Sequence, residues 1–134
     1  MRARAKSRRA GQSLVEFAFT VIIFLNLVLG TINLAYGVYC YHTIAYAARD
    51  AVRYAIVRGP NSALPATTAQ IQQTAVDAAI GVNLALSNVT VSWPTDASLA
   101  THKDVKVTVA LNYPLLLTPA SMTLSSTSQM MASQ

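Results

Sequence analysis

The stretch Phe17-Ala-Phe-Thr-Val-Ile-Ile-Phe-Leu-Asn-Leu-Val-Leu-Gly30 decides the fold class of this chain. It is the most apolar part of a longer segment, Phe17 to Ala48, that contains no Asp, Glu, Lys or Arg. About 20 apolar residues in a helix cross the hydrocarbon core of a bilayer, so residues 14–37 are long enough to do so. A buried core helix is the alternative, but such a helix is rarely apolar all round over this length. The run therefore predicts one transmembrane helix near the N-terminus.

Charge is distributed unevenly along the chain. The 134 residues carry a net charge of +5, and residues 1–11 hold five basic residues and no acid, so the whole excess lies in this leader. A nucleic-acid-binding domain would spread its basic residues over a folded surface, so nucleic acid is excluded as a partner. Basic residues stay on the cytoplasmic side of a membrane. The distribution therefore predicts a cytoplasmic N-terminus and an extracytoplasmic C-terminal part.

The predicted helix extends beyond the membrane. Ala45, Ala48, Val52 and Ala55 recur at helical spacing and form a face that can pack on a domain. Gly59-Pro60 is a strong helix stop. We therefore expect one helix from about residue 13 to 58, continuous from the membrane into the outer domain.

The remaining residues predict a small α+β domain over 59–134. Ala66–Ile80 has the pattern of a second helix, with Thr67 or Thr68 as N-cap and Gly81 as the C-terminal stop. Apolar and polar residues alternate as in strands over Asn88–Trp93, Val105–Tyr113 and, more weakly, Thr123–Met131. Residues 94–104 form a polar loop between the first two strands. The predicted fold is a long N-terminal helix followed by a second helix and a three-stranded antiparallel sheet.

The composition argues against catalysis and against bound cofactors. The single cysteine, Cys40, cannot form an intramolecular disulfide or a zinc site alone, and the two histidines, His42 and His102, lie far apart in the chain. No Ser-His-Asp arrangement and no glycine-rich phosphate loop is recognisable. The sequence predicts a protein that is not an enzyme, with no metal, no cofactor and no small-molecule substrate.

Two residues at the N-terminal end of the apolar run are unusual. Gly11 closes the basic leader, and Glu16 stands alone at the edge of the apolar residues. A carboxylate that enters a bilayer costs about 2–3 kcal/mol and usually has a partner. The alternative is an acid at the headgroup level, where the dipole of the helix N-terminus favours negative charge.

The segment Arg8-Arg-Ala-Gly-Gln-Ser-Leu-Val-Glu-Phe-Ala18 resembles the class III signal of type IV pilins and pseudopilins. Together with Val15–Ala18, Gly30 and Ala47–Ala55, it is similar to the TadE-like family of tight-adherence (Flp) pilus systems. The resemblance implies cleavage between Gly11 and Gln12 by a prepilin peptidase, and pairing of Glu16 with the Gln12 amine of a neighbouring subunit. Many members have a proline at the position of Ile22 and an acid at that of Asn33. Because this chain has neither, the assignment to TadE, TadF or a generic pseudopilin stays open.

The resemblance also implies an organisation and a function. Residues 1–11 are a cleaved leader, 12–58 a transmembrane pilin-like helix, and 59–134 an extracytoplasmic domain. The protein is then a minor pilin or pseudopilin of the bacterial inner membrane that contributes to pilus biogenesis and surface adhesion. Its partners are the prepilin peptidase and other pilins or pseudopilins of the same system. The rival hypotheses are an uncleaved single-pass protein with a small binding domain, and a membrane-bound enzyme.

A stripe of small and amide residues follows one face of the predicted helix. It comprises Asn26, Gly30, Asn33, Gly37 and Cys40, at spacings of three and four residues. Such residues let membrane helices approach closely and form interhelical hydrogen bonds. The pattern predicts a helix–helix packing face, with chance placement of tolerated residues as the alternative.

Overall fold

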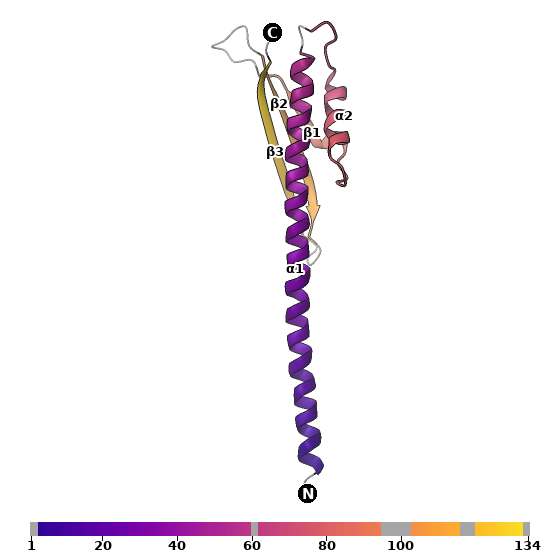
Figure 1. Ribbon diagram of the computed structural model, residues 1–134, viewed down its shortest axis with the longest axis vertical. Helices are drawn as coiled ribbons and strands as arrows, with labels where there is room; N and C mark the ends of the chain where they lie inside the picture. Colours follow the sequence, from indigo (N-terminus) through magenta and orange to yellow (C-terminus); the bar gives the residue numbers. More distant parts are fainter. Residues whose placement is uncertain (1–2, 60–61, 95–102, 116–119, 133–134) are drawn as a thin grey trace.

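The computed structural model describes residues 3–59, 62–94, 103–115 and 120–132. Its elements, in chain order, are α1 (Ala3–Val57), α2 (Thr68–Ala78), a short 3-10 helix η1 (Leu86–Asn88), β1 (Val89–Ser92), β2 (Lys103–Pro114) and β3 (Ser121–Ala132). Figure 1 shows that the N-terminal half of α1 stands free, whereas its C-terminal half carries α2 and the sheet. The predicted α+β fold, with a long helix, a second helix and a three-stranded antiparallel sheet, is confirmed.

Helix α1 contains 55 residues, which corresponds to a length of about 80 Å at 1.5 Å per residue. It begins at Ala3, so the expected start near residue 13 is wrong. The leader is rich in alanine, arginine and lysine, which favour helices, and Gly11 alone costs only about 1 kcal/mol. The helix ends at Val57, one residue before the predicted end.

Helix α2 is held at its start by a capping box. The side chain of Thr67 accepts a hydrogen bond from the backbone N–H of Gln70 (3.3 Å), and the Gln70 side chain accepts one from the N–H of Thr67 (3.0 Å). Gly81 has a φ of 77°, a left-handed conformation that glycine adopts at low cost after a helix end. Of the two predicted N-caps, Thr67 and Thr68, Thr67 is the one observed, and the helix is two residues shorter at each end than the predicted 66–80.

The sheet has the strand order β1-β2-β3, and both strand pairs are antiparallel. All three predicted strands are present, with β2 and β3 longer than predicted and β1 slightly shorter. Within β3, Ser126 and Ser128 lie opposite Val109 and Val107 and are half-buried. These serines explain the weak alternation of β3, because they occupy inner positions without being apolar. Residues 95–102 of the predicted polar loop lie outside the described residues.

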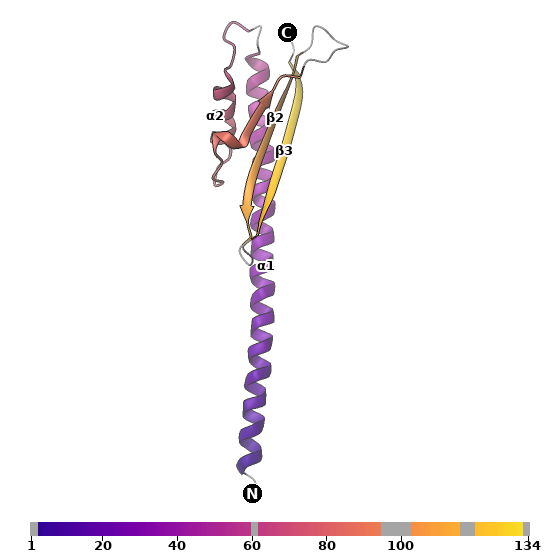
Figure 2. The ribbon, with the colours of Figure 1, turned by 180° about the vertical axis from the view of Figure 1, so that it is seen from behind.

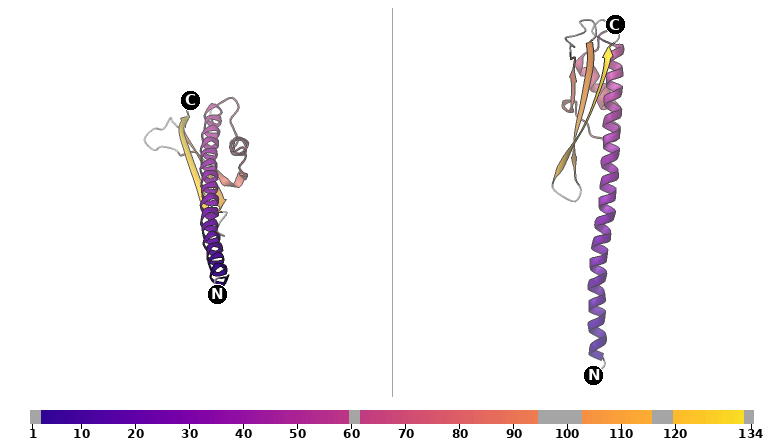
Figure 3. Two further views of the ribbon diagram at one scale, coloured as in Figure 1. Left: turned by 60° about the horizontal axis from the view of Figure 1, so that its bottom comes forward. Right: turned by 90° about the vertical axis from the view of Figure 1, so that its left-hand side faces the viewer.

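Two helices cover one face of this sheet. Helix α1 packs on β2 and β3, and α2 packs on α1 and β1, an arrangement that Figures 2 and 3 show from behind and from the side. Val105, Val107 and Val109 of β2 are fully buried. On α1, the alanines at 47, 48, 51 and 55 are also fully buried, and their small size lets the helix lie close to the strands. The predicted packing face of α1 is confirmed, with Ala45 at its edge and only half-buried.

Candidate functional site

The N-terminal half of α1 exposes large apolar side chains around its whole circumference. Phe17, Ile23 and Phe24 are 67%, 66% and 62% exposed. The helix from Gly11 to Val57 contains an 18-residue window with a mean hydropathy of 2.2, and none of that window is buried by the rest of the chain. The side chains of a core helix would instead be buried by the rest of the chain. It is consistent with a single-pass membrane protein whose span a bilayer covers.

The polar side chains within this apolar segment turn back to their own helix. The hydroxyls of Thr20 and Thr31 and the amide of Asn26 each donate to the backbone carbonyl four residues earlier, at 2.9 Å. Such bonds reduce the cost of placing these groups in hydrocarbon. The Asn26 side chain nevertheless stays exposed on the helix surface. It can therefore form a further hydrogen bond with a neighbouring helix.

Gly11, Gln12 and Glu16 all lie on exposed turns of α1. A side chain built at Gly11 would meet no atom within 4 Å. The side-chain amide of Gln12 donates to a carboxylate oxygen of Glu16 at 3.2 Å, a contact between neighbouring helical turns. This contact joins two side chains of one helix and does not involve the backbone amine of Gln12.

The outer domain covers one part of the predicted packing stripe and leaves the other part uncovered. Asn26 is exposed, and the space around Gly30 is open for at least 4 Å. Asn33 is only 8% exposed. A Cβ atom at Gly37 would lie 3.7 Å from the ring of Tyr113. The lower part of the stripe therefore faces outward, whereas its upper part is already occupied by β2 of the same chain.

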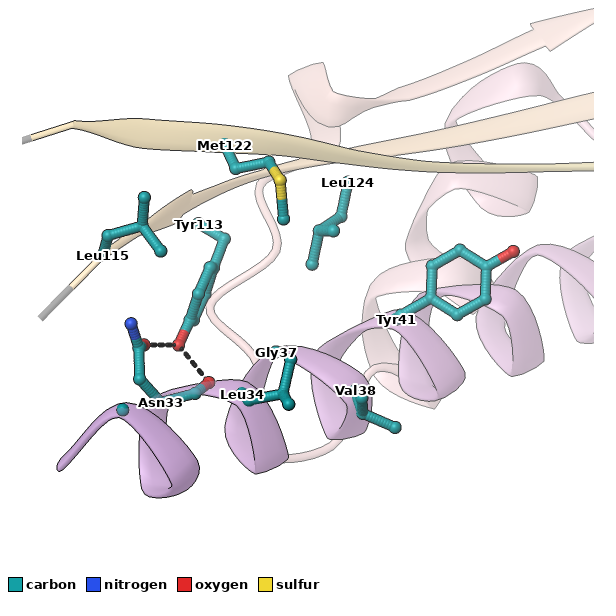
Figure 4. Close-up of a pocket in the computed structure, with 10 residues that line it drawn as sticks. Asn33, Leu34, Gly37, Val38, Tyr41, Tyr113, Leu115, Met122 and Leu124 are labelled. Atoms are coloured by element: carbon teal, nitrogen blue, oxygen red, sulfur yellow. Dashed lines mark hydrogen bonds between the residues drawn. The ribbon is translucent and has the colours of Figure 1, made fainter. Parts of the chain in front are cut away.

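Tyr113 is the residue that joins the sheet to this stripe, and its role could not be read from the sequence. Its hydroxyl donates to the backbone oxygen of Asn33 at 2.9 Å and also contacts the Asn33 side-chain oxygen, as Figure 4 shows. Its ring lies 5.7 Å from that of Tyr36. The alternation of β2 places Tyr113 on the inner face with Leu111 and Val109. Its partner on α1, however, lies 80 residues away in the chain.

Further toward the C-terminus of α1, a second tyrosine joins this helix to the segment that follows α2. The hydroxyl of Tyr39 donates to the backbone oxygen of Ile80 at 2.9 Å. Ile80 precedes Gly81, the left-handed residue that follows α2. Tyr39 and Tyr113 together fix the positions of the end of α2 and of the sheet along α1.

An apolar groove opens between α1 and the end of the β2–β3 hairpin. It has a volume of about 390 Å³, and Figure 4 shows its walls. The lining residues are Gly30, Asn33, Leu34, Gly37, Val38, Tyr41, Tyr113, Leu115, Met122 and Leu124. Within the part of the chain that the structure describes, no three His, Cys, Asp or Glu side chains gather as metal ligands.

Comparison with known protein families matches residues 11–53 to the family described as TadE-like protein. The chain contains a TadE-like domain. The matched segment includes Gly11, Gln12, Glu16 and the stripe from Asn26 to Gly37 on α1, and leaves the sheet outside the match. No curated protein and no solved structure matches the chain. TadE-like proteins are a pilus biogenesis family of the Tad pilus system and are generally not enzymes.

Proposed function

We propose that this TadE-like chain is a minor pilin or pseudopilin of a tight-adherence (Flp) pilus system. It contributes to pilus biogenesis and surface adhesion as a single-pass protein of the bacterial inner membrane, with domain 59–134 outside. One observation carries the proposal: the apolar half of α1 stands free, with Gly11 and Glu16 at its lower end, inside the TadE-like segment. Its partners are the prepilin peptidase and other pilins or pseudopilins of the same system.

Processing after Gly11 is the first step of this function. The cut removes the basic leader and leaves a new amine on Gln12. Gly11 is exposed and has open space around it, so a peptidase can approach its backbone. Glycine also weakens the helix locally, by about 1 kcal/mol relative to alanine. This supports cleavage at this position, because the peptide bond must leave the helix to enter an active site.

Glu16 then joins the processed subunit to a neighbour. Its carboxylate is exposed, and the Gln12 side chain offers it only a neutral donor. A charge left unpaired in apolar surroundings is costly, and the Gln12 amine of another subunit supplies the opposite charge. Asn26, which is exposed, and Gly30, which is half-buried with open space beside it, lie further along the same helix and form the face along which the two helices pack.

N-terminal processing is tested with Gly11→Val in the native host. The open space around Gly11 means that valine leaves the fold intact, so any loss of cleavage arises at the peptidase. We expect wild-type protein to begin at Gln12 by intact mass and Gly11→Val to retain residues 1–11. Ala18→Val, a similar change at another exposed position of α1, should be cleaved normally. A wild-type protein that keeps its leader would favour the uncleaved single-pass rival.

Pairing of Glu16 is tested with Glu16→Gln, which keeps the side-chain size and the contact with Gln12. Losing one member of a buried charge pair costs about 3–5 kcal/mol, more than a hundredfold in an association equilibrium. We expect the variant to be cleaved but absent from co-purified pilus assemblies. Thr20→Val is the control, because the Thr20 hydroxyl bonds its own helix. Normal co-assembly of Glu16→Gln would contradict the pairing and leave the processing proposal standing.

A further inference from the structure

We propose that the paired ends of β2 and β3 at Tyr113 and Met122 enter the outer leaflet, and that lipid acyl chains fill the groove between them and α1. The hairpin is then a second membrane contact, separate from the span. The inference rests on the proposed function in one respect, namely that α1 crosses the bilayer.

The first step concerns the depth of Asn33. Glu16 marks the cytoplasmic edge of the apolar run, and Asn33 lies seventeen residues further along α1. At 1.5 Å per residue this separation is about 26 Å, compared with a hydrocarbon core of about 30 Å. Any tilt of the helix places Asn33 deeper still. Asn33 therefore lies just inside the outer boundary of the hydrocarbon.

Three of the five tyrosines of α1 lie at the same boundary. Tyr36, Tyr39 and Tyr41 follow Asn33 within eight residues, and each is 47% exposed. Tyrosine is enriched where hydrocarbon meets the headgroups, because its ring is apolar and its hydroxyl polar. An outer aromatic belt at residues 36–41 agrees with the depth counted from Glu16.

The hairpin reaches down to this height. The Tyr113 hydroxyl binds the backbone oxygen of Asn33, and Met122 is the partner of Tyr113 across the strand pair. Figure 3 shows this end of β2 and β3 lying beside the middle of α1, on the side toward the N-terminus. Met122 at the hairpin end is 51% exposed. The lower end of the sheet is therefore placed at the membrane surface or within it.

The charge pattern of the sheet fits this orientation. From Val107 to Gln134 the chain contains no Asp, Glu, Lys or Arg. Asp104 and Lys106 lie toward the opposite end of β2, nine and seven residues from Tyr113, which is about 20–30 Å at the rise of a strand. Asp104 and Lys106 therefore lie on the aqueous side of the headgroups, whereas the end of β2 at Tyr113 has no charged side chain.

The groove continues the lipid-facing surface of α1. Leu34 and Val38 form its helix side and are 70% and 50% exposed, and Leu115 and Met122 form its hairpin side (Figure 4). An apolar hollow of this kind, open to the side at hydrocarbon depth, is filled by acyl chains from the surrounding leaflet. A helix from a second copy is the competing occupant.

Depth-dependent fluorescence quenching tests the proposal. The full chain, with Trp93→Phe to remove its single tryptophan, is reconstituted in phosphatidylcholine vesicles brominated at defined acyl positions. Single tryptophans are introduced as Met122→Trp at the hairpin end, Met131→Trp near the far end of β3, and Phe24→Trp in the span. Met122 and Met131 are the same residue type on one strand, about 30 Å apart.

We expect bromines near the outer surface to quench Met122→Trp at least fivefold more than Met131→Trp, and bromines near the bilayer centre to quench Phe24→Trp. If Phe24→Trp is quenched but Met122→Trp behaves like Met131→Trp, the hairpin contact is wrong and the membrane span stands. Blue-shifted Met122→Trp emission without bromine quenching would place a second copy in the groove and overturn the lipid assignment. Absence of quenching at Phe24→Trp would overturn both the span and the hairpin contact.

Discussion

Replacing Tyr113 by phenylalanine removes the hydroxyl that joins β2 to α1 and keeps the ring that covers Gly37. In the wild-type chain this hydroxyl lies 2.9 Å from the backbone oxygen of Asn33 and also contacts its side chain. Tyr113 is 4% exposed and Asn33 is 8% exposed, so water has little access to replace the lost partner. A buried polar group without a partner costs about 1–3 kcal/mol. We expect Tyr113→Phe to lower the free energy of unfolding of the domain by that amount.

Urea unfolding in detergent micelles measures this change. Trp93 is the only tryptophan of the chain, and it packs against the core of the domain, so its fluorescence reports domain unfolding while the span stays in the micelle. The midpoint should fall with an unchanged slope, as expected for a loss of stability alone. Tyr41→Phe is the control, because Tyr41 is 47% exposed, and its midpoint should match that of wild type.

A double-mutant cycle shows whether the loss belongs to the Tyr113–Asn33 contact. Asn33→Leu removes the side-chain partner and leaves the backbone oxygen of Asn33 in place, and the combined variant removes both polar side-chain groups from the interface. Replacing both partners by apolar groups is nearly neutral, so the double variant should be more stable than the sum of the single losses predicts, by about 1 kcal/mol or more. A wild-type midpoint for Tyr113→Phe would refute the argument that this hydroxyl holds the sheet on the helix, and a strictly additive cycle would refute a contribution from the Asn33 side chain.

Three further glycine substitutions distinguish strain within the chain from contacts between chains. Gly81→Ala should destabilise the domain by about 1–2 kcal/mol, because φ is 77° and the new Cβ would lie 2.8 Å from the Tyr39 hydroxyl; Gly59→Ala, with its nearest atom at 3.6 Å, should leave the urea midpoint unchanged. A Cβ atom at Gly30 would meet no atom within 4 Å, so Gly30→Leu should leave domain stability unchanged while reducing crosslinking between copies in membranes. Ala35→Leu, on a different helix face, should preserve crosslinking, and equal crosslinking of both variants would favour chance placement of the stripe.

Local signals in the sequence were sufficient for most of the secondary structure. The apolar run, the helix stop after Arg58, the Thr67 cap and the alternation of β2 each depend on residues within a few positions of one another. The elements they predict are present in the structure. The start of α1 was the exception, because Gly11 alone does not stop a helix whose flanking residues favour one.

The position of the domain along α1 was decided by tertiary structure alone. The stripe of Asn26, Gly30, Asn33 and Gly37 could be recognised in the sequence, but nothing local distinguished its lower part from its upper part. That division depends on Tyr113, which is 80 residues from Asn33 and reaches it only because α1 packs on β2 and β3 at one register. The register follows from the fit of alanines on α1 against valines and serines of the sheet. Such a fit between distant segments is a property of their packing in three dimensions, and no periodicity along the chain encodes it.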